Sequence, residues 1–335
     1  GRDSAATFSP PPRPGPFLFR HLCAPRPMTP IGVGGPRRLM AAASARRPGR
    51  RCRRALFLAE AAVAQLLVAP ISALVTPTTT TTPPALAPRV YWTAAEEEHA
   101  GHIYAMGGAE GQGVLVSGLR HPSSIAVDPW SSKIFWTDSR DQTVSKANLD
   151  GSGVEVILTN LQNPLGLTVD GPRGTMYFGD GGRVVRSDVN GKSTQELGSG
   201  FMIVATVISW TERRLYWCDS MAAKIVRYNL DDGSTEDVVT NILDPSGLAL
   251  DLGRGKLYWS SSLIGAIHRS NLDGTKRELV FSGLTSPGEI AVNAEHGRIY
   301  WTRVARRAAV MAGDLNGTVI GELVTGTRIS GAAFL

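Results

Sequence analysis

Cysteine is scarce in this chain of 335 residues, which contains only Cys23, Cys52 and Cys218. Two of the three precede residue 89, so the body that follows has a single cysteine and cannot form an internal disulfide. The 247 residues from 89 to 335 are long enough to bury a core without disulfide support. The cysteine count therefore leaves both a secreted and an intracellular protein open.

The first 88 residues contain no Trp, Tyr or Lys, and only two acidic residues against twelve Arg. Fifteen of the 21 Pro also lie in this segment. We expect it to be disordered, because it has few core-forming residues and many chain breakers. The segment carries a net charge of +10 and the body −4, so the overall +6 does not describe the body. A mildly acidic body lacks the basic patch of a nucleic-acid-binding domain, and we expect no nucleic-acid partner.

The composition of the N-terminal segment is typical of a targeting sequence. Residues 1–54 are rich in Arg, Pro and Ala, and the apolar stretch 55–75 is interrupted by Glu60 and Pro70. This order predicts a secretory signal or membrane anchor at 55–75, with an organelle transit peptide as the alternative. Residues 76–88 form a Thr/Pro-rich linker. We expect an extracellular or membrane-anchored protein of the secretory pathway, or one in the lumen of a plastid or another organelle.

An adjacent pair of aromatic residues recurs throughout the body. The pairs are Tyr91-Trp92, Phe135-Trp136, Tyr177-Phe178, Tyr216-Trp217, Tyr258-Trp259 and Tyr300-Trp301. Their first members are 44, 42, 39, 42 and 42 residues apart. Six occurrences at so regular a spacing indicate a repeat architecture with a unit of about 42 residues.

Each repeat has the pattern of four short strands. An apolar strand precedes most pairs, as in HPSSIAVD (121–128), and a later strand ends in a tight turn, as in ANLDG (147–151). Asp-Gly and Asn-Gly are strong hairpin signals. Neighbouring side chains of a strand point to opposite faces, so an aromatic pair needs both faces buried. These features predict an all-β fold, a six-bladed β-propeller of four-stranded blades, over residues 89–335.

The two ends of the body complement each other. The first repeat begins at its aromatic strand, RVYWT (89–93), and lacks the preceding inner strand. The last segment, ISGAAFL (329–335), has the inner-strand pattern but no aromatic strand after it. We therefore predict that 329–335 pairs with 89–93 and closes the ring, which removes two open sheet edges.

Three of the aromatic strands support a family resemblance. KIFWTD (133–138), RLYWCD (214–219) and RIYWT (298–302) resemble the YWTD repeats of the low-density-lipoprotein-receptor family, known as class B repeats. The resemblance covers about the whole of 89–335. It implies a six-bladed propeller that is not an enzyme and that binds a protein or peptide ligand.

Residues that recur in each repeat are expected to be structural. The acid of the motif is kept at Asp138, Asp180 and Asp219 only, and a carboxylate repeated once per blade is expected to cap turn N–H groups. The aromatic pairs are expected to form core. Asn316 begins the one N-glycosylation sequon of the body, in an expected hairpin turn.

Metal ligands are poorly represented. EEEHAGH (96–102) groups Glu98, His99 and His102, but two histidines in a loop without a third ligand elsewhere are a weak signal. We expect no metal and no cofactor. Cys218 stands inside a strand and is expected to be a buried, unreactive thiol.

Polar residues that differ between blades are better candidates for recognition. In a propeller, the loops between the second and third strands share one face with the loops that lead into the next inner strand. That face would carry His121, Arg140, Asn163, Arg183, Lys224, Asp244, Arg303 and Arg307. Such an uneven surface suits an extended peptide or a protein ligand.

Two other functions remain open at this point. A hydrolase or lactonase of the gluconolactonase or strictosidine-synthase type would need an asymmetric set of carboxylate, Asn or His groups in the central channel. The inner strands offer mostly small apolar residues, as in SSIAV and GLTV, and we identify no such set. An intracellular scaffold would require that the N-terminal segment is not a targeting signal.

Overall fold

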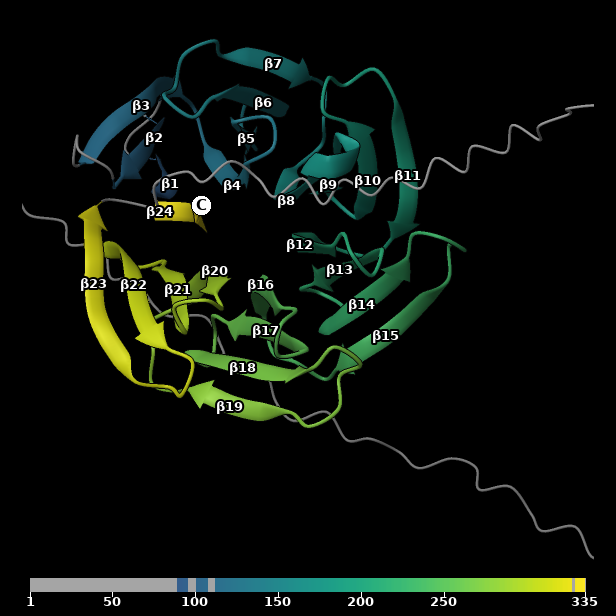
Figure 1. Cartoon of the computed structure of the whole chain (residues 1–335), viewed down its shortest axis with the longest axis vertical. Helices are drawn as coiled ribbons and strands as arrows, with labels where there is room; N and C mark the ends of the chain where they lie inside the picture. The colour runs from purple at the N-terminus through teal and green to yellow at the C-terminus, as the bar shows by residue number, and fades with distance from the viewer. Residues whose placement is uncertain (1–88, 96–100, 108–111, 327–328, 335) are drawn as a thin grey trace, which may run out of the picture. The chain divides into compact units, whose positions relative to one another are not determined.

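The computed structural model describes residues 89–95, 101–107, 112–326 and 329–334. These residues form six antiparallel sheets of four strands, which follow one another around a central axis (Figure 1). The six-bladed propeller is thus confirmed. The expectations for residues 1–88 lie outside the described residues. Within the described ranges, no helix is long and apolar enough to cross a membrane.

Each sheet, or blade, starts at the centre with an inner strand. The inner strands are β4 (Pro122–Asp128), β8 (Pro164–Asp170), β12 (Ile203–Ser209), β16 (Pro245–Asp251), β20 (Pro287–Asn293) and β24 (Ile329–Phe334). The aromatic pairs lie on the second strands. These are β1 (Val90–Ala95), β5 (Lys133–Asp138), β9 (Thr175–Asp180), β13 (Arg214–Asp219), β17 (Lys256–Ser261) and β21 (Arg298–Arg303).

The two remaining strands complete each blade toward the outside. The third strands are β2 (Gly101–Met106), β6 (Thr143–Asn148), β10 (Arg183–Asp188), β14 (Lys224–Asn229), β18 (Ala266–Asn271) and β22 (Ala308–Asp314). The outer strands are β3 (Gln112–Leu119), β7 (Glu155–Leu158), β11 (Thr194–Ser199), β15 (Thr235–Thr240), β19 (Glu278–Phe281) and β23 (Val319–Gly326). We number the blades 1 to 6 from the blade that contains β1.

Blade 1 is assembled from both ends of the body. Its strand order is β24-β1-β2-β3, so the C-terminal strand forms the inner edge beside β1 (Figure 1). The register pairs Tyr91 with Ala333 and Thr93 with Gly331. The other five blades are continuous in sequence. The predicted closure of the ring is therefore confirmed.

The aromatic pairs pack between neighbouring blades. Tyr91 belongs to a buried cluster with Trp136 of blade 2, whereas Trp92 belongs to a cluster with Val310 of blade 6. The two members of one pair thus cover opposite faces of β1. A fully buried aromatic side chain of about 150 Å² contributes roughly 4 kcal/mol by area, as an upper estimate. This packing, repeated around the ring, is the main apolar contact that holds neighbouring blades together.

The strand order gives the propeller two distinct ends. The inner strands begin at one end, which we call the upper end. It carries the loops that lead into the inner strands and the loops between second and third strands. The lower end carries the η1 turn (Gly171–Arg173) and the Asn-Gly and Asp-Gly turns.

Closure of the ring predicts the effect of a C-terminal deletion. Removal of residues 329–335 exposes the inner edge of β1 and removes the buried side chains of Ile329 and Ala332. We expect the free energy of unfolding to fall by about 3 kcal/mol or more, which lowers Tm by roughly 10 °C. Thermal unfolding measures this, with removal of residue 335 alone as the control. An unchanged Tm in the longer deletion would contradict closure by β24.

Candidate functional site

The motif carboxylates hold the upper loops together. Asp138, at the end of β5, accepts hydrogen bonds from the backbone N–H groups of Arg120 (2.9 Å) and His121 (3.0 Å). It also accepts bonds from the N–H groups of Arg140 (3.1 Å) and Asp141 (2.9 Å). The equivalent carboxylates that bond loop N–H groups in blades 3 and 4 are Asp180 and Asp219. This is the turn-capping geometry expected of a carboxylate repeated once per blade.

The predicted ligand-face residues all lie at the upper end, but they do not converge on one point. Four of the five basic ones form ion pairs within their own blade. These pairs are Arg183–Asp180, Lys224–Asp237 (2.9 Å), Arg303–Glu322 (2.7 Å) and Arg307–Glu322 (3.6 Å). Local acids therefore offset much of the positive charge that the sequence places on this face.

The remaining candidates are held by local hydrogen bonds. Arg140 is exposed, and its backbone N–H is bound by Asp138. The imidazole Nδ1 of His121 lies 2.9 Å from the Ser139 hydroxyl. Asn163 donates its backbone N–H to Asp180 over 2.9 Å, and Asp244 accepts a hydrogen bond from the Ser262 hydroxyl. Of these, His121 also lines a cavity of the channel.

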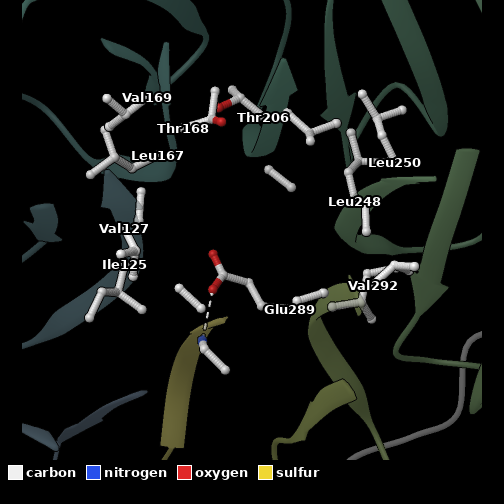
Figure 2. A pocket seen from close by; sticks show the side chains of 18 residues that line it. Ile125, Val127, Leu167, Thr168, Val169, Thr206, Leu248, Leu250, Glu289 and Val292 are labelled. Carbon is white, nitrogen blue, oxygen red and sulfur yellow. Dashed lines mark hydrogen bonds between the residues drawn. The ribbon is translucent and has the colours of Figure 1, made fainter. Parts of the chain in front are cut away.

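The channel contains two cavities, one above the other. The upper cavity, of about 230 Å³, is lined by residues at the beginnings of the inner strands, and by His121 and Val304. The lower cavity, of about 260 Å³, is lined by the middle and end of the inner strands, mostly by aliphatic side chains. Glu289 of β20 lines both cavities. Its carboxylate points into the channel from the wall (Figure 2).

Glu289 occupies a position where the other blades have small residues. Each inner strand has a register shift against its second strand near its third residue, as between Pro287 and Ile290. The residues at this position in the other blades are Ser124, Gly166, Ala205, Gly247 and Gly331. Space is short there, since a Cβ on Gly247 would lie 2.6 Å from the carbonyl oxygen of Gly288. A β-bulge redirects a side chain, and here it turns one carboxylate inward.

The Glu289 carboxylate connects three blades. The Ser124 hydroxyl of blade 2 donates a hydrogen bond to its Oε1 atom. The backbone N–H of Ala332, in the closing strand β24, donates to its Oε2 atom over 3.1 Å (Figure 2). Ser124 Oγ in turn accepts the N–H of Leu167 in blade 3 over 3.1 Å. Glu289 of blade 6 is therefore bonded across the seam where the ring closes.

Burial in the aliphatic channel raises the pKa of Glu289 to about 7, although the hydrogen bonds from Ser124 and Ala332 act in the opposite direction. Removal of water from a carboxyl group disfavours its charged form. No Lys or Arg side chain lines either cavity among the described residues, so no cation offsets the burial. His121 is the other titratable side chain on the lining.

Large apolar side chains are exposed on one part of the upper end. They are Phe201, Met221, Leu243, Leu263, Ile264 and Val304, between 48% and 75% exposed. All six lie in upper loops of blades 4, 5 and 6, and we call them the upper apolar arc. Val304 also lines the upper cavity, so the arc reaches the mouth of the channel. An exposed apolar surface of this kind is typical of a protein interaction site.

Sequence reasoning missed both Glu289 and the upper apolar arc. The signal for Glu289 was present, because SPGEIAVN (286–293) has a glutamate where the other inner strands have a small residue. The arc residues had no repeat signal, since loop hydrophobics belong to no periodic pattern. Only the fold brings Met221 and Leu263, which are 42 residues apart, to equivalent loops of adjacent blades.

Few of the residues considered as metal ligands lie in the described part of the chain. Among the residues that the structure describes, no three His, Cys, Asp or Glu side chains come together as a ligand set. His102 lies in β2, and Glu98 and His99 lie outside the described residues. The Cys218 thiol is fully buried, and burial raises its pKa well above the ordinary value.

Comparison with known proteins agrees with the repeat pattern. The family model described as Low-density lipoprotein receptor repeat class B matches residues 132–170. The low-density lipoprotein receptor-related protein 5 of Mus musculus is 36% identical over 95 residues, 28% of this chain and 6% of that protein. The Homo sapiens protein is 35% identical over 141 residues, 39% of this chain and 9% of that protein. The chain thus spans less than a tenth of the length of these curated relatives.

Solved structures share the fold at low sequence identity. A chain from the crystal structure of a nidogen/laminin complex aligns with a TM-score of 0.66 and 19% identity, over 74% of this chain and 98% of that one. A gluconolactonase from Xanthomonas campestris aligns with a TM-score of 0.55 and 17% identity, over 64% of this chain and 79% of that one. At these identities the likeness concerns the fold alone.

The fold defines the class of protein as a six-bladed β-propeller with four-stranded blades. Within that class, the chain carries a low-density lipoprotein receptor class B repeat and is homologous to the receptor-related protein 5 sequences. The resemblance to the YWTD repeat family is therefore confirmed.

The raised pKa of Glu289 predicts how stability depends on pH. Between its ordinary pKa of 4.5 in the unfolded chain and about 7 in the native state, the native protein binds more protons. The free energy of unfolding therefore decreases as pH rises through this range and stays lower above it. A shift of this size corresponds to at most about 3 kcal/mol, and the effect is smaller because Glu289 is only partly buried.

Denaturant unfolding at pH 5.5 and pH 8.0 measures this effect. We expect Glu289→Gln to remove most of the decrease in stability between these pH values, because glutamine does not titrate. Glu212→Gln, an exposed position at the lower end, is the matched control and should keep the decrease. An equal pH dependence in wild type and Glu289→Gln would contradict the assignment.

Proposed function

We propose that this propeller is a non-enzymatic binding module whose upper end binds a protein or peptide. The observation that carries the proposal is the upper apolar arc, which is confined to three neighbouring blades and leads to the mouth of the channel. Burial of exposed apolar side chains supplies most of the favourable free energy in protein association. The ligand should therefore present apolar side chains to blades 4, 5 and 6.

The eight polar candidates of the upper end would form the rim of this interface. Because Arg183, Lys224, Arg303 and Arg307 are already paired, their charges fix loop geometry more than they attract a ligand. Rim charges of this kind affect orientation and association rate more than affinity. The apolar arc would then supply the affinity, and the polar rim the specificity.

The comparisons support a binding role. The curated relatives are named as receptor-related proteins, and the nidogen/laminin structure is a complex of two proteins. The gluconolactonase neighbour shares the fold, but an enzyme of that type needs an asymmetric set of polar groups in the channel. The described channel lining presents one carboxylate, with His121 at its upper end and otherwise only hydroxyl, glycine and aliphatic residues, which favours binding over hydrolysis.

We further propose a secretory location, with residues 55–75 as signal or tether, 76–88 as linker and 89–335 as the binding domain. Asn316 is exposed in the turn between β22 and β23, where a glycan would meet no obstacle from the described core. In cells that secrete the chain, peptide-N-glycosidase should increase its gel mobility, and Asn316→Gln should abolish the increase. A cytosolic chain with an intact N-terminus would contradict this location.

A peptide selection tests the binding face. Peptides selected from a random displayed library on the full chain should lose at least tenfold in affinity for Leu263→Glu, about 1.4 kcal/mol. Leu263 is 75% exposed in the upper loop between β17 and β18, so a charge there disturbs binding rather than the fold. Titration calorimetry with the purified variants measures the loss.

The matched control lies in the same blade. Leu279→Glu introduces the same charge at a side chain that is 57% exposed on the outer strand β19, away from the upper loops. It should leave affinity unchanged. Peptides that bind Leu263→Glu normally, but fail to bind Leu279→Glu, would place the interface on the outer edge and overturn the proposal.

A further inference from the structure

We propose that the protein ligand inserts a lysine side chain through the upper cavity, so that its ammonium group meets the Glu289 carboxylate as counter-ion. This inference rests on the proposed function, because the lysine comes from the ligand that docks on the upper end. It assigns a specific chemistry to the mouth of the channel, which the apolar arc by itself does not do.

The Glu289 carboxylate has no counter-ion in the described part of the propeller, unlike the motif carboxylate of blade 3. Asp180, the motif carboxylate of blade 3, has Arg183 beside it as well as loop N–H groups. Glu289 has two neutral donors and no cation on the lining of either cavity. A carboxylate in aliphatic surroundings without a counter-ion is costly. A cation from outside would relieve that cost.

The second argument is the exceptional position of Glu289 in the ring. Five blades have serine, glycine or alanine at the bulge, so a blade forms without a carboxylate at this position. The Glu289 side chain is longer than those and reaches the boundary between the two cavities. Figure 2, which draws the lower cavity, shows the Glu289 side chain directed into the channel among aliphatic residues such as Leu167 and Leu248.

The third argument is the size and lining of the upper cavity. Its volume of about 230 Å³ is below the roughly 300 Å³ at which pockets begin to accept whole drug-sized ligands, so a single side chain fits better. Leu165, Val204 and Val304 provide apolar walls for a four-carbon stem. Ser123, Ser246 and Ser330 also lie on this lining, and each of their hydroxyl groups donates a hydrogen bond to a backbone carbonyl oxygen.

Lysine fits this site better than arginine. Both Glu289 oxygens already accept one hydrogen bond each, from Ser124 and Ala332. A guanidinium group gains most of its advantage from a bidentate contact with two free carboxylate oxygens. An ammonium group acts as a compact charge and needs only one remaining lone pair of the carboxylate.

The site should respond to pH. Besides Glu289, the inner strands place only serine, glycine, leucine and valine residues on the upper cavity, and His121, just before β4, is the other titratable group. With a pKa of about 7, Glu289 is about one-tenth ionised at pH 6 and nine-tenths ionised at pH 8. A cation that binds only the ionised Glu289 carboxylate should therefore bind about tenfold more tightly at pH 8 than at pH 6.

The probe for this test is Nα-acetyl-lysine methylamide, added to the full chain carrying carbon-13 at the glutamate side-chain carboxyls. The Glu289 signal is identified by its loss in Glu289→Gln. In wild type the probe should lower the pKa of Glu289 and bind about tenfold more tightly at pH 8 than at pH 6. The pH dependence left in Glu289→Gln measures the share of all other groups.

Three results separate the outcomes. Glu212→Gln should bind the probe as wild type does, whereas Glu289→Gln and the Nε-acetylated probe should show a loss of at least tenfold. Equal binding to Glu289→Gln would overturn the site, and so would an unchanged Glu289 pKa in wild type when the probe is added. Selected peptides that depend on Leu263 but not on their own lysines would overturn this inference and leave the proposed function standing. If butylamine binds but lysine-bearing peptides do not, the site takes an ammonium group that does not come from a lysine of the ligand, and the inference is overturned in that part.

Discussion

Closure of the ring by the C-terminal strand is the constraint on which the rest of the structure depends. Each blade buries its aromatic pair against the blades on both sides, so the packing is complete only if the first blade meets the sixth. Strand β24 brings the first and sixth blades into contact. Glu289 accepts hydrogen bonds across this junction from Ala332 and Ser124. The same contact that seals the ring therefore places the single carboxylate of the channel.

The two ends of the propeller then acquire different chemistry. At the upper end, motif carboxylates such as Asp138 hold the loops that surround the channel, while blades 4, 5 and 6 expose apolar side chains. The core, which is nearly the same in each blade, keeps these loops in fixed positions. Because the loops differ and the core does not, recognition can be specific without any change in the scaffold.

Much of the fold could be predicted from the sequence, and little of the site. The spacing of the aromatic pairs, the Asn-Gly and Asp-Gly turns, and the unmatched end strands predicted six blades and their closure. These features are repeated, so each copy supports the others. Glu289 and Leu263, on which the proposed function rests, lie where the repeat is broken, and a single sequence does not show which departures are meaningful. The ion pairs of Lys224 and Arg303 also required coordinates, because Asp237 and Glu322 lie on later strands of the same blades and only the folded sheet brings them close.

The central claim is that the upper end, with Glu289 at its centre, is the binding face. A crystal structure of the full chain with one selected peptide tests it most directly. The account predicts apolar peptide side chains on Leu263 and its neighbours in the arc, and a lysine ammonium group within hydrogen-bond distance of the Glu289 carboxylate. A peptide bound at the lower end or along an outer strand, with the upper cavity empty, would contradict it.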